Sequence, residues 1–179
     1  MHGIIHAELK RFVAERHGAD GWPRLIEAAG MAPTPYVAHR TYADEELTSV
    51  VEADSRATGR PVSEVLSDFG EFIAPTLLSV YAPFVHADWR TLDLIEHTEA
   101  TIHTVVRLRD RGAAPPYLQA RRVSPNEVVV EYTSPRRLCM VAEGIARGIA
   151  RHYAESIEIT QPECMLRGGE RCVIEVRKM

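Results

Sequence analysis

The sequence contains no apolar run near the length that crosses a bilayer. A membrane-spanning helix needs about 20 consecutive apolar residues, and no stretch of these 179 residues approaches that length. No basic segment precedes an apolar one at the start of the chain, so we expect no secretory signal peptide. Three cysteines are too few, and an odd number, for a secreted disulfide framework. These absences predict a cytoplasmic protein that does not contact the membrane.

An excess of basic charge and the common catalytic signatures are also missing. The net charge of −4 argues against a dedicated nucleic-acid-binding surface. The sequence has no glycine-rich phosphate loop, no GxSxG nucleophile motif and no paired-carboxylate pattern. The acidic and histidine residues just before His103 are Glu96, His97 and Glu99. In our interpretation none of them forms an HExxH motif or an i,i+4 metal pair with His103, so the sequence gives no support for a zinc hydrolase.

Residues 1–112 show the apolar periodicity of helices. The composition, with 45% apolar and 26% charged residues, fits one globular domain. Helices are predicted to stop at Gly18, Gly30 and Gly59, and Pro75 is expected to kink the fourth. The longest helix is predicted from Asp88 to Arg111, before Gly112.

Residues 113–179 read differently, as two hairpins around a helix. The predicted elements are strands Tyr117–Val123 and Val128–Tyr132, a helix from Pro135 to about Ala154, and strands Ser156–Leu166 and Cys172–Arg177. The fold class is therefore α+β, with a helical part (1–112) packed on a ββαββ unit (113–179) that carries one antiparallel sheet.

His103 is the histidine with the most suggestive surroundings. It lies within a predicted helix between Ile102 and Val105. A single histidine on an apolar helix face is more often a packed core residue than a ligand, but a neutral imidazole there is also what heme iron requires. The other scattered histidines are expected at the surface: His2, His6, His17 and His152.

The segment Tyr132–Arg136 carries three polar side chains at alternating positions. In an extended backbone Tyr132, Ser134 and Arg136 point the same way and offer two hydroxyls and a guanidinium to one anionic group. The alternative is a strand end that leads into a helix N-cap at Ser134. Spacing alone does not choose between them.

Three cysteines converge in the predicted C-terminal unit. Cys164 and Cys172 flank the last hairpin turn, and Cys139 lies one turn into the preceding helix. Three thiolates provide three of the four ligands that zinc prefers. Alternatively, they are small buried apolar residues, as free cysteines commonly are.

In combination, these residues resemble the heme nitric oxide/oxygen-binding (H-NOX) family, the sensor domain related to that of soluble guanylate cyclase. The likeness covers the whole chain: Met1–Ile5 followed by an amphipathic helix, Tyr132-x-Ser134-x-Arg136 as the YxSxR signature, Pro115–Pro116, and His103 lying 29 residues before Tyr132. The resemblance implies a sensor, not an enzyme, in which His103 binds the iron of heme b. It implies that Tyr132, Ser134 and Arg136 hold the propionates, with Asp44 as the partner of Arg136.

The resemblance also implies the rest of the heme pocket. Ile5 and Pro116 match positions that distort the macrocycle, and Val141 takes the place of the tyrosine that stabilises bound O₂ in other members. Its expected neighbours are apolar: Leu9, Ile73, Leu77 and Ile145. Ferrous heme binds O₂ in a polarised form that needs a hydrogen-bond donor, whereas NO needs none. The sequence therefore predicts a nitric oxide sensor.

Signalling is expected to proceed by NO weakening the bond between His103 and iron, so that the two parts of the chain rotate. The resemblance implies a separate effector, a histidine kinase or a cyclic-di-GMP-metabolising protein. An alternative is a thiol/zinc redox sensor that uses Cys139, Cys164 and Cys172, although Gln161 stands where some members have the fourth, histidine ligand. An enzyme that degrades heme or scavenges NO is a third alternative, disfavoured by the apolar distal set.

Overall fold

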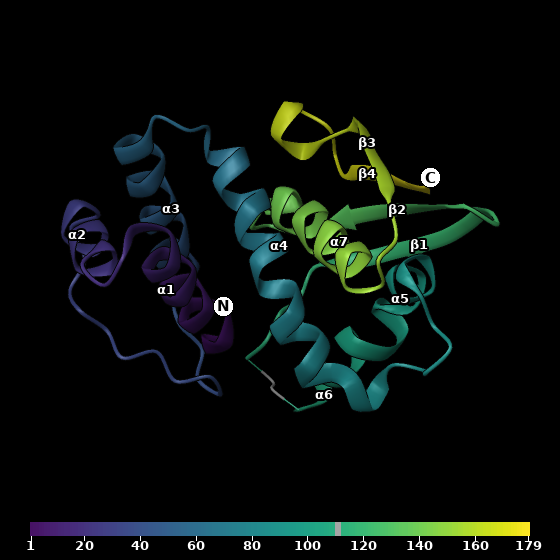
Figure 1. Cartoon of the computed structure of the whole chain (residues 1–179), viewed down its shortest axis with the longest axis horizontal. Helices are drawn as coiled ribbons and strands as arrows, with labels where there is room; N and C mark the ends of the chain where they lie inside the picture. Colours follow the sequence, from purple (N-terminus) through teal and green to yellow (C-terminus); the bar gives the residue numbers. More distant parts are fainter. Residues whose placement is uncertain (110–111) are drawn as a thin grey trace.

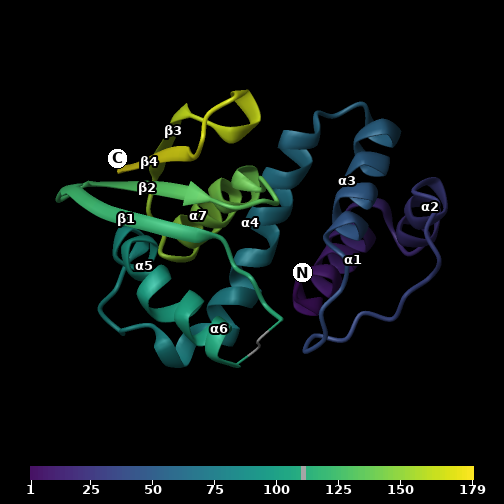
Figure 2. The same cartoon turned by 180° about the vertical axis from the view of Figure 1, so that it is seen from behind.

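The fold is a group of N-terminal helices joined to a sheet-based unit, seen in a computed structural model that describes residues 1–109 and 112–179. Helices α1, α2 and α3 lie together on one side, α4 lies between them and α7, and the sheet lies beyond (Figures 1 and 2). The helices are α1 (Gly3–His17), α2 (Gly21–Ala28), α3 (Asp44–Thr58), α4 (Val62–Tyr81), α5 (Thr91–His97), α6 (Thr104–Arg109) and α7 (Cys139–His152). Short helical turns are η1 (Ala82–Phe84), η2 (Glu99–His103) and η3 (Met165–Arg167). Among the described residues, no helix has the length and apolar character to span a membrane.

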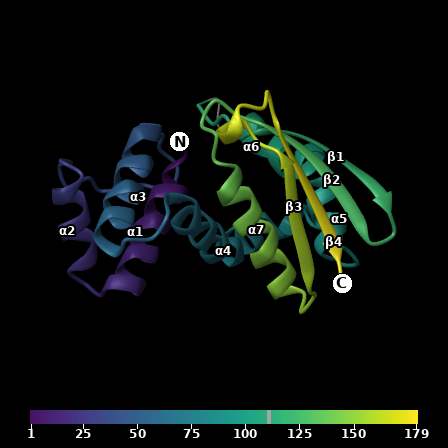
Figure 3. The same cartoon turned by 90° about the horizontal axis from the view of Figure 1, so that it is seen from above.

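The sheet has four antiparallel strands in the order β1-β2-β4-β3. They are β1 (Tyr117–Ser124), β2 (Glu127–Thr133), β3 (Ile157–Glu163) and β4 (Cys172–Lys178). Alternate side chains, such as Val128 and Val130 on β2 and Ile174 and Val176 on β4, are buried in one cluster with α5 and α7. One face of the sheet is therefore covered, and α7 lies along it in Figure 3. The predicted α+β class is confirmed.

Helices α4 and α7 pack with their backbones in contact, because glycine occupies the crossing on both helices. A Cβ atom on Gly70 would lie 2.2 Å from the carbonyl oxygen of Val141, and one on Gly144 would lie 2.0 Å from that of Ser67. Likewise, a Cβ atom on Gly148 would lie 2.4 Å from the Cβ of Ala74. The largest helix interface thus joins the predicted helical part to the predicted ββαββ unit.

Two local predictions about helices were wrong. The helix expected to begin at Pro135 begins at Cys139, because Ser134 uses its hydroxyl to accept the backbone N–H of Arg136 in a turn and does not cap a helix. The helix expected over Asp88–Arg111 is divided into α5, a π-helical turn (η2) and α6. Its last two predicted residues, 110–111, lie outside the described residues.

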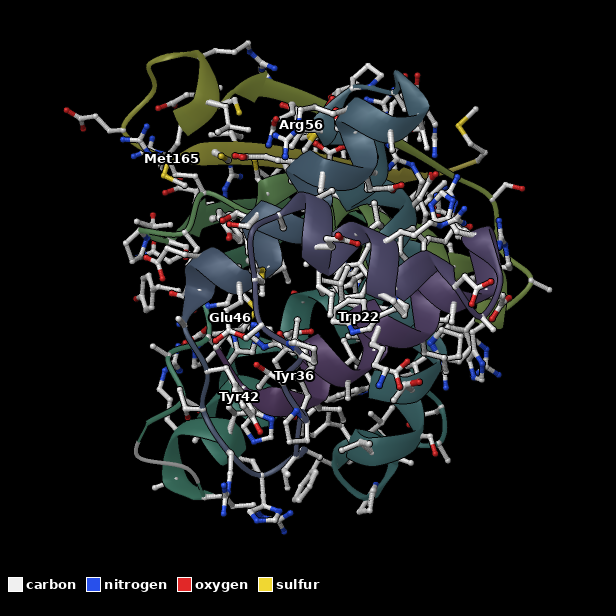
Figure 4. The ribbon with its side chains drawn as sticks, turned by 90° about the vertical axis from the view of Figure 1, so that its left-hand side faces the viewer. Trp22, Tyr36, Tyr42, Glu46, Arg56 and Met165 are labelled. Carbon is white, nitrogen blue, oxygen red and sulfur yellow. The ribbon has the colours of Figure 1, made fainter. Side chains whose placement is uncertain are left out.

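His6 was also predicted incorrectly, since it is buried and not at the surface. Its side chain is 1% exposed, its Nε2 lies 3.2 Å from the carbonyl oxygen of Ala43, and its ring stacks on Tyr36. Tyr36 in turn contacts Tyr42 and Trp22 edge-on and donates a hydrogen bond to Glu46. Figure 4 shows these labelled side chains beside one another where the loop after α2 crosses α1. The aromatic cluster fastens that loop to the helices.

We predict that Gly144→Ala destabilises the protein. In an exposed helix interior, alanine in place of glycine stabilises by about 1 kcal/mol. Here the new Cβ atom would meet backbone atoms of α4, and we expect a loss of about 1–3 kcal/mol from the free energy of unfolding. Urea denaturation measures the change, with the exposed Lys10→Ala on α1 as a control near zero. A stabilised Gly144→Ala protein would contradict the backbone contact.

Candidate functional site

A largely apolar cavity of about 300 Å³ lies between α4, α7, the covered face of the sheet and the π-helical turn. This volume falls within the range of small-molecule and cofactor pockets. His103 lines it, and so do the three polar residues of the predicted fork: Tyr132, Ser134 and Arg136. The segments that the sequence analysis singled out 29 residues apart therefore meet at one cavity.

Most of the predicted apolar pocket residues also lie on the cavity wall. They are Ile5, Leu77, Pro116, Val141 and Ile145. Leu9 and Ile73 do not line the cavity; they are 1% and 0% exposed and belong to the core cluster between α1 and α4. The cavity face of α4 is formed instead by Phe69, Ala74, Leu77, Leu78 and Tyr81, and Ile73 faces the neighbouring core.

His103 is the last residue of a π-helical turn. Its backbone N–H bonds to the carbonyl of Thr98, five residues earlier, at 3.0 Å. Threonine hydroxyls donate to carbonyls along this segment: Thr98 to Leu94, Thr101 to His97 and Thr104 to Glu99, at 2.7–3.1 Å. Such side-chain bonds compete with the backbone hydrogen bonds of a helix and often bend it, and π turns occur frequently at functional sites.

Glu99 is the functional residue that the sequence analysis missed. Its Oε2 lies 2.9 Å from Nδ1 of His103, and it also accepts the Nη1 hydrogen of Arg107 (2.7 Å) and the backbone N–H of Leu118 (3.1 Å). The sequence analysis considered Glu99 only as part of a metal pair with His103, whereas the structure shows a direct hydrogen bond between the two side chains. The signal was the four-residue spacing itself, because residues four apart face each other on a helix.

The environment of His103 keeps its imidazole neutral. Burial lowers the pKa of His103, and this effect exceeds the opposing hydrogen bonds from Glu99 and the Pro116 carbonyl. For Glu99, burial alone would raise the pKa, but hydrogen bonds from Arg107, His103 and Leu118 outweigh it and lower the pKa. A neutral histidine whose Nδ1 hydrogen bonds to a carboxylate has Nε2 available as a metal ligand.

Tyr132, Ser134 and Arg136 lie close together at the end of β2. Burial raises the pKa of Tyr132 to about 12 despite its hydrogen bond with Ser134, so its hydroxyl stays a donor at neutral pH. Arg136 donates from Nε to Asp44 Oδ2 at 2.7 Å and from Nη1 to the carbonyl of Ala114. Of the five guanidinium hydrogens, these two bonds leave three for an anionic ligand.

Asp44 connects this fork to the N-terminal helices. It is the first residue of α3, and its Oδ1 lies 2.8 Å from the backbone nitrogen of Met1 while its Oδ2 holds Arg136. Burial would raise the pKa of Asp44, but the two cationic partners outweigh it and lower the pKa. The ion pair expected between Asp44 and Arg136 is thus present, and it spans from α3 to the segment after β2.

Three further polar side chains line the cavity and were not anticipated: those of His2, Tyr81 and Thr98. His2, which was expected at the surface, immediately precedes α1, Tyr81 ends α4, and Thr98 immediately precedes the π-helical turn. Burial raises the pKa of Tyr81, more than the nearby Arg109 lowers it, so the phenol keeps its proton. The cavity wall therefore contains one tyrosine hydroxyl besides that of Tyr132.

The three cysteines form a second cluster, at the other end of α7 from the His152 terminus. All three are buried, and their sulfur atoms lie within 4.8 Å of one another; the Cys139–Cys164 and Cys164–Cys172 distances are 3.8 and 3.9 Å. This is the one group of three or more histidine, cysteine or acidic residues with metal-site spacing in the described part of the chain. The predicted convergence of Cys139, Cys164 and Cys172 is present.

The protonation of these thiols differs from one to the next. Burial raises the pKa of Cys139 to about 12 and raises that of Cys172 as well. For Cys164, burial also acts upward, but the backbone N–H of Leu166 and the neighbouring thiols lower its pKa below the ordinary value. The Gln161 amide lies against Cys139, and its buried nitrogen and oxygen form no regular hydrogen bond among the described residues.

The residues around the cavity fit a heme. The group has an apolar macrocycle, an iron that takes an axial nitrogen ligand, and two carboxylates. The apolar walls, the neutral His103 and the fork of Tyr132, Ser134 and Arg136 match these three parts. A single cavity thus provides each kind of contact that a heme requires.

Comparisons with known proteins agree with this match. The family model described as Haem-NO-binding matches residues 2–161. The crystal structure of an H-NOX protein from Shewanella oneidensis in the Fe(II)NO ligation state superposes with a TM-score of 0.93, at 28% identity, covering 100% of this chain and 99% of that one. The NMR structure of an H-NOX domain from the same organism in the Fe(II)CO state gives a TM-score of 0.88, at 29% identity and the same coverage.

A curated relative is the soluble guanylate cyclase gcy-35 of Caenorhabditis elegans. It is 24% identical over 167 residues, which are 87% of this chain. The chain spans only 23% of the length of that protein. Because the family model covers most of the sequence, the chain belongs to the Haem-NO-binding (H-NOX) family of heme-based gas sensor domains.

Proposed function

We propose that this chain is a nitric oxide sensor that holds ferrous heme b through His103 and has no catalytic activity of its own. The observation that carries the proposal is the single cavity that brings a neutral, oriented histidine and the Tyr132–Ser134–Arg136 fork to apolar walls. When bound, the heme supplies a ferrous iron that takes up NO. The chain's own residues orient that iron and exclude water.

Each side chain has a role in this proposal. His103 would hold the heme iron through a ring nitrogen, and Tyr132, Ser134 and Arg136 would hold the propionates by hydrogen bonds and charge. Ile5 and Pro116 lie on the cavity wall, where they would contact the macrocycle. Val141, Leu77 and Ile145 form a wall without hydrogen-bond donors on the side where the gas binds, which favours NO over O₂.

We propose that the signal is transmitted through two contacts at the cavity: the bond from His103 to the heme iron, and the ion pair of Arg136 with Asp44. His103 belongs to the segment after α5, whereas Ile5 and Asp44 belong to α1 and α3. Release of His103 would remove one attachment while Arg136 keeps its ion pair with Asp44 at the other. The group of α1–α3 then shifts relative to α4, α7 and the sheet, a two-state change of the kind that gas-sensing requires. The proposed effector is a histidine kinase or a cyclic-di-GMP-metabolising protein.

The iron ligand is tested by substituting His103. We expect His103→Ala to lower heme affinity at least about tenfold and to change the Soret band of the ferrous protein, because the axial nitrogen is lost. Absorption titration with heme measures both. His97→Ala is the control, since His97 is exposed and stacks on Trp89. An unchanged spectrum in His103→Ala would refute the assignment of His103 as the iron ligand.

The selectivity for NO is tested at Val141. The reduced wild-type protein is expected to form no stable oxy complex in air, whereas Val141→Tyr adds a donor and slows O₂ dissociation about tenfold. Val141→Phe, which has the ring without the hydroxyl, should behave as the wild type. Tyr81→Phe is the third variant, because Tyr81 also lines the cavity. If the wild type forms a stable oxy complex and Tyr81→Phe does not, Tyr81 is the hydrogen-bond donor and the proposed selectivity for NO is refuted.

A second candidate function rests on the buried thiols. We propose that Cys139, Cys164 and Cys172 form a thiol site that binds zinc weakly or responds to oxidation, because three sulfur atoms within 4.8 Å of each other offer three ligands. The fourth neighbour is Gln161, whose amide is a poor zinc ligand. In the redox-sensor alternative, this thiol site would be the sensor in place of the heme. Otherwise it would act in addition to the heme.

Substitution of Gln161 tests that site. We expect Gln161→His to retain zinc after dialysis against a chelator, while the wild type loses it, because an imidazole completes a tetrahedral set. Elemental analysis of zinc and iron, with and without peroxide, measures both proteins. Gln119→His, on the sheet edge, is the control for a histidine that cannot reach the thiols. Purified wild type with zinc but no heme would favour the redox alternative over the NO sensor.

A further inference from the structure

We infer that Glu99 is a positioning residue for the iron ligand: its carboxylate holds the Nδ1 hydrogen of His103 and thereby sets which ring nitrogen binds iron and how firmly. This inference rests on the proposed ligation of heme by His103. It is based on the contacts that the Glu99 carboxylate makes.

The first observation is the hydrogen bond itself. The Glu99 Oε2 to His103 Nδ1 distance is 2.9 Å, and the two side chains are 22% and 13% exposed. An imidazole whose Nδ1 hydrogen is held by a carboxylate exposes the lone pair of Nε2. The tautomer that can bind iron is therefore selected before heme arrives.

The second observation is that the carboxylate cannot turn away. Its Oε1 receives Nη1 of Arg107 at 2.7 Å, and its Oε2 also receives the backbone N–H of Leu118 at 3.1 Å. Arg107 is held in turn by the Pro116 carbonyl, 3.3 Å from Nη2. Three donors from different segments fix Glu99, so the position of the His103 ring is defined from the start of β1 as well as from its own helix.

These contacts have a consequence for the bond to iron. A partner that accepts the second N–H of a ligating histidine makes the ring a stronger donor, and its removal commonly changes metal affinity or activity 10–100-fold. A carboxylate, being ionised, does this more strongly than a neutral acceptor. Glu99 would therefore strengthen the bond from His103 to a heme iron held there.

The competing interpretation is that Glu99 merely ties the π-helical turn to β1. In that case its removal would lower stability without changing the bonding of His103. The two interpretations differ in the tautomer of the ring and in the iron–histidine vibration, which a structural tie does not affect.

The experiment compares Glu99→Gln and Glu99→Ala with Glu96→Gln. Glu96 is an acidic residue one turn earlier that pairs with Arg122, 2.9 Å away, and does not line the cavity. NMR of the ¹⁵N-labelled heme-free proteins reports the His103 tautomer, and resonance Raman spectroscopy of the ferrous proteins reports the iron–histidine stretch. Stopped-flow mixing with NO gives the rate at which the His103–iron bond is lost.

In the heme-free wild type we expect the Nδ1–H tautomer, and in Glu99→Ala a mixture. We expect Glu99→Gln to move the iron–histidine stretch to lower frequency and to speed loss of the bond after NO addition at least about tenfold. Glu96→Gln should match the wild type in all three measurements. Thermal unfolding is recorded for every protein, so that a change in stability is seen separately.

The inference is overturned if both Glu99 variants keep the wild-type tautomer and stretching frequency, even when their unfolding temperature falls. A wild-type protein without any iron–histidine band would instead refute the proposed heme ligation. The tautomer measurement on heme-free protein would then still decide whether Glu99 orients His103, so the two failures are distinguishable.

Discussion

The close contact of α4 with α7 determines the geometry on which the cavity depends. Gly70, Gly144 and Gly148 let the two helix backbones touch where any side chain would collide with backbone or Cβ atoms. Apolar side chains of both helices, such as Leu77 and Val141, line the cavity of about 300 Å³ together with the sheet. Close-packed interiors normally leave no space of this size, so rigid walls are needed to keep it open.

Polar groups at this cavity are held in place by hydrogen bonds to other residues. His103 is held by Glu99, and Arg136 is held by Asp44 and the Ala114 carbonyl. Asp44 and Ala114 come from other segments, and Glu99 is itself held by Arg107 and by Leu118 of β1, so each ligand-facing group is oriented before a ligand binds. Such preorganisation reduces the conformational entropy that binding would otherwise cost. It also connects the cavity to α3 on one side and to the start of β1 on the other.

The two proposed sites adjoin each other, since Cys172 on β4 pairs with Tyr132 on β2. The thiol cluster lies where α7 begins and β3 and β4 are joined, immediately after the propionate fork in the sequence. Only four residues separate Ser134 from Cys139. A change of charge or geometry at the thiols would therefore act on the segment that carries Arg136.

Much of this organisation is determined locally and was predictable from the sequence. Apolar periodicity and the stops at Gly18 and Gly59 predicted α1 and α3, and strand alternation predicted the sheet, whereas only the resemblance to the family connected His103 with Tyr132. The start of α7 was misplaced because Ser134 forms a turn with Arg136 in preference to a cap. His6 was misplaced because its burial depends on a loop 30 residues away.

Tertiary structure decided what local pattern could not. Whether Leu9 and Ile73 line the cavity depends on the rotation of α1 and α4 about their axes, and a one-residue difference on a helix turns a side chain by about 100°. Tyr81 reaches the cavity, and Glu99 reaches His103 and β1 at once, only because separate segments converge there. The sequence by itself determined the order of helices and strands and, through the family resemblance, indicated candidate residues for a heme pocket. The packing of distant segments determined which of these residues line the cavity and what holds them in place.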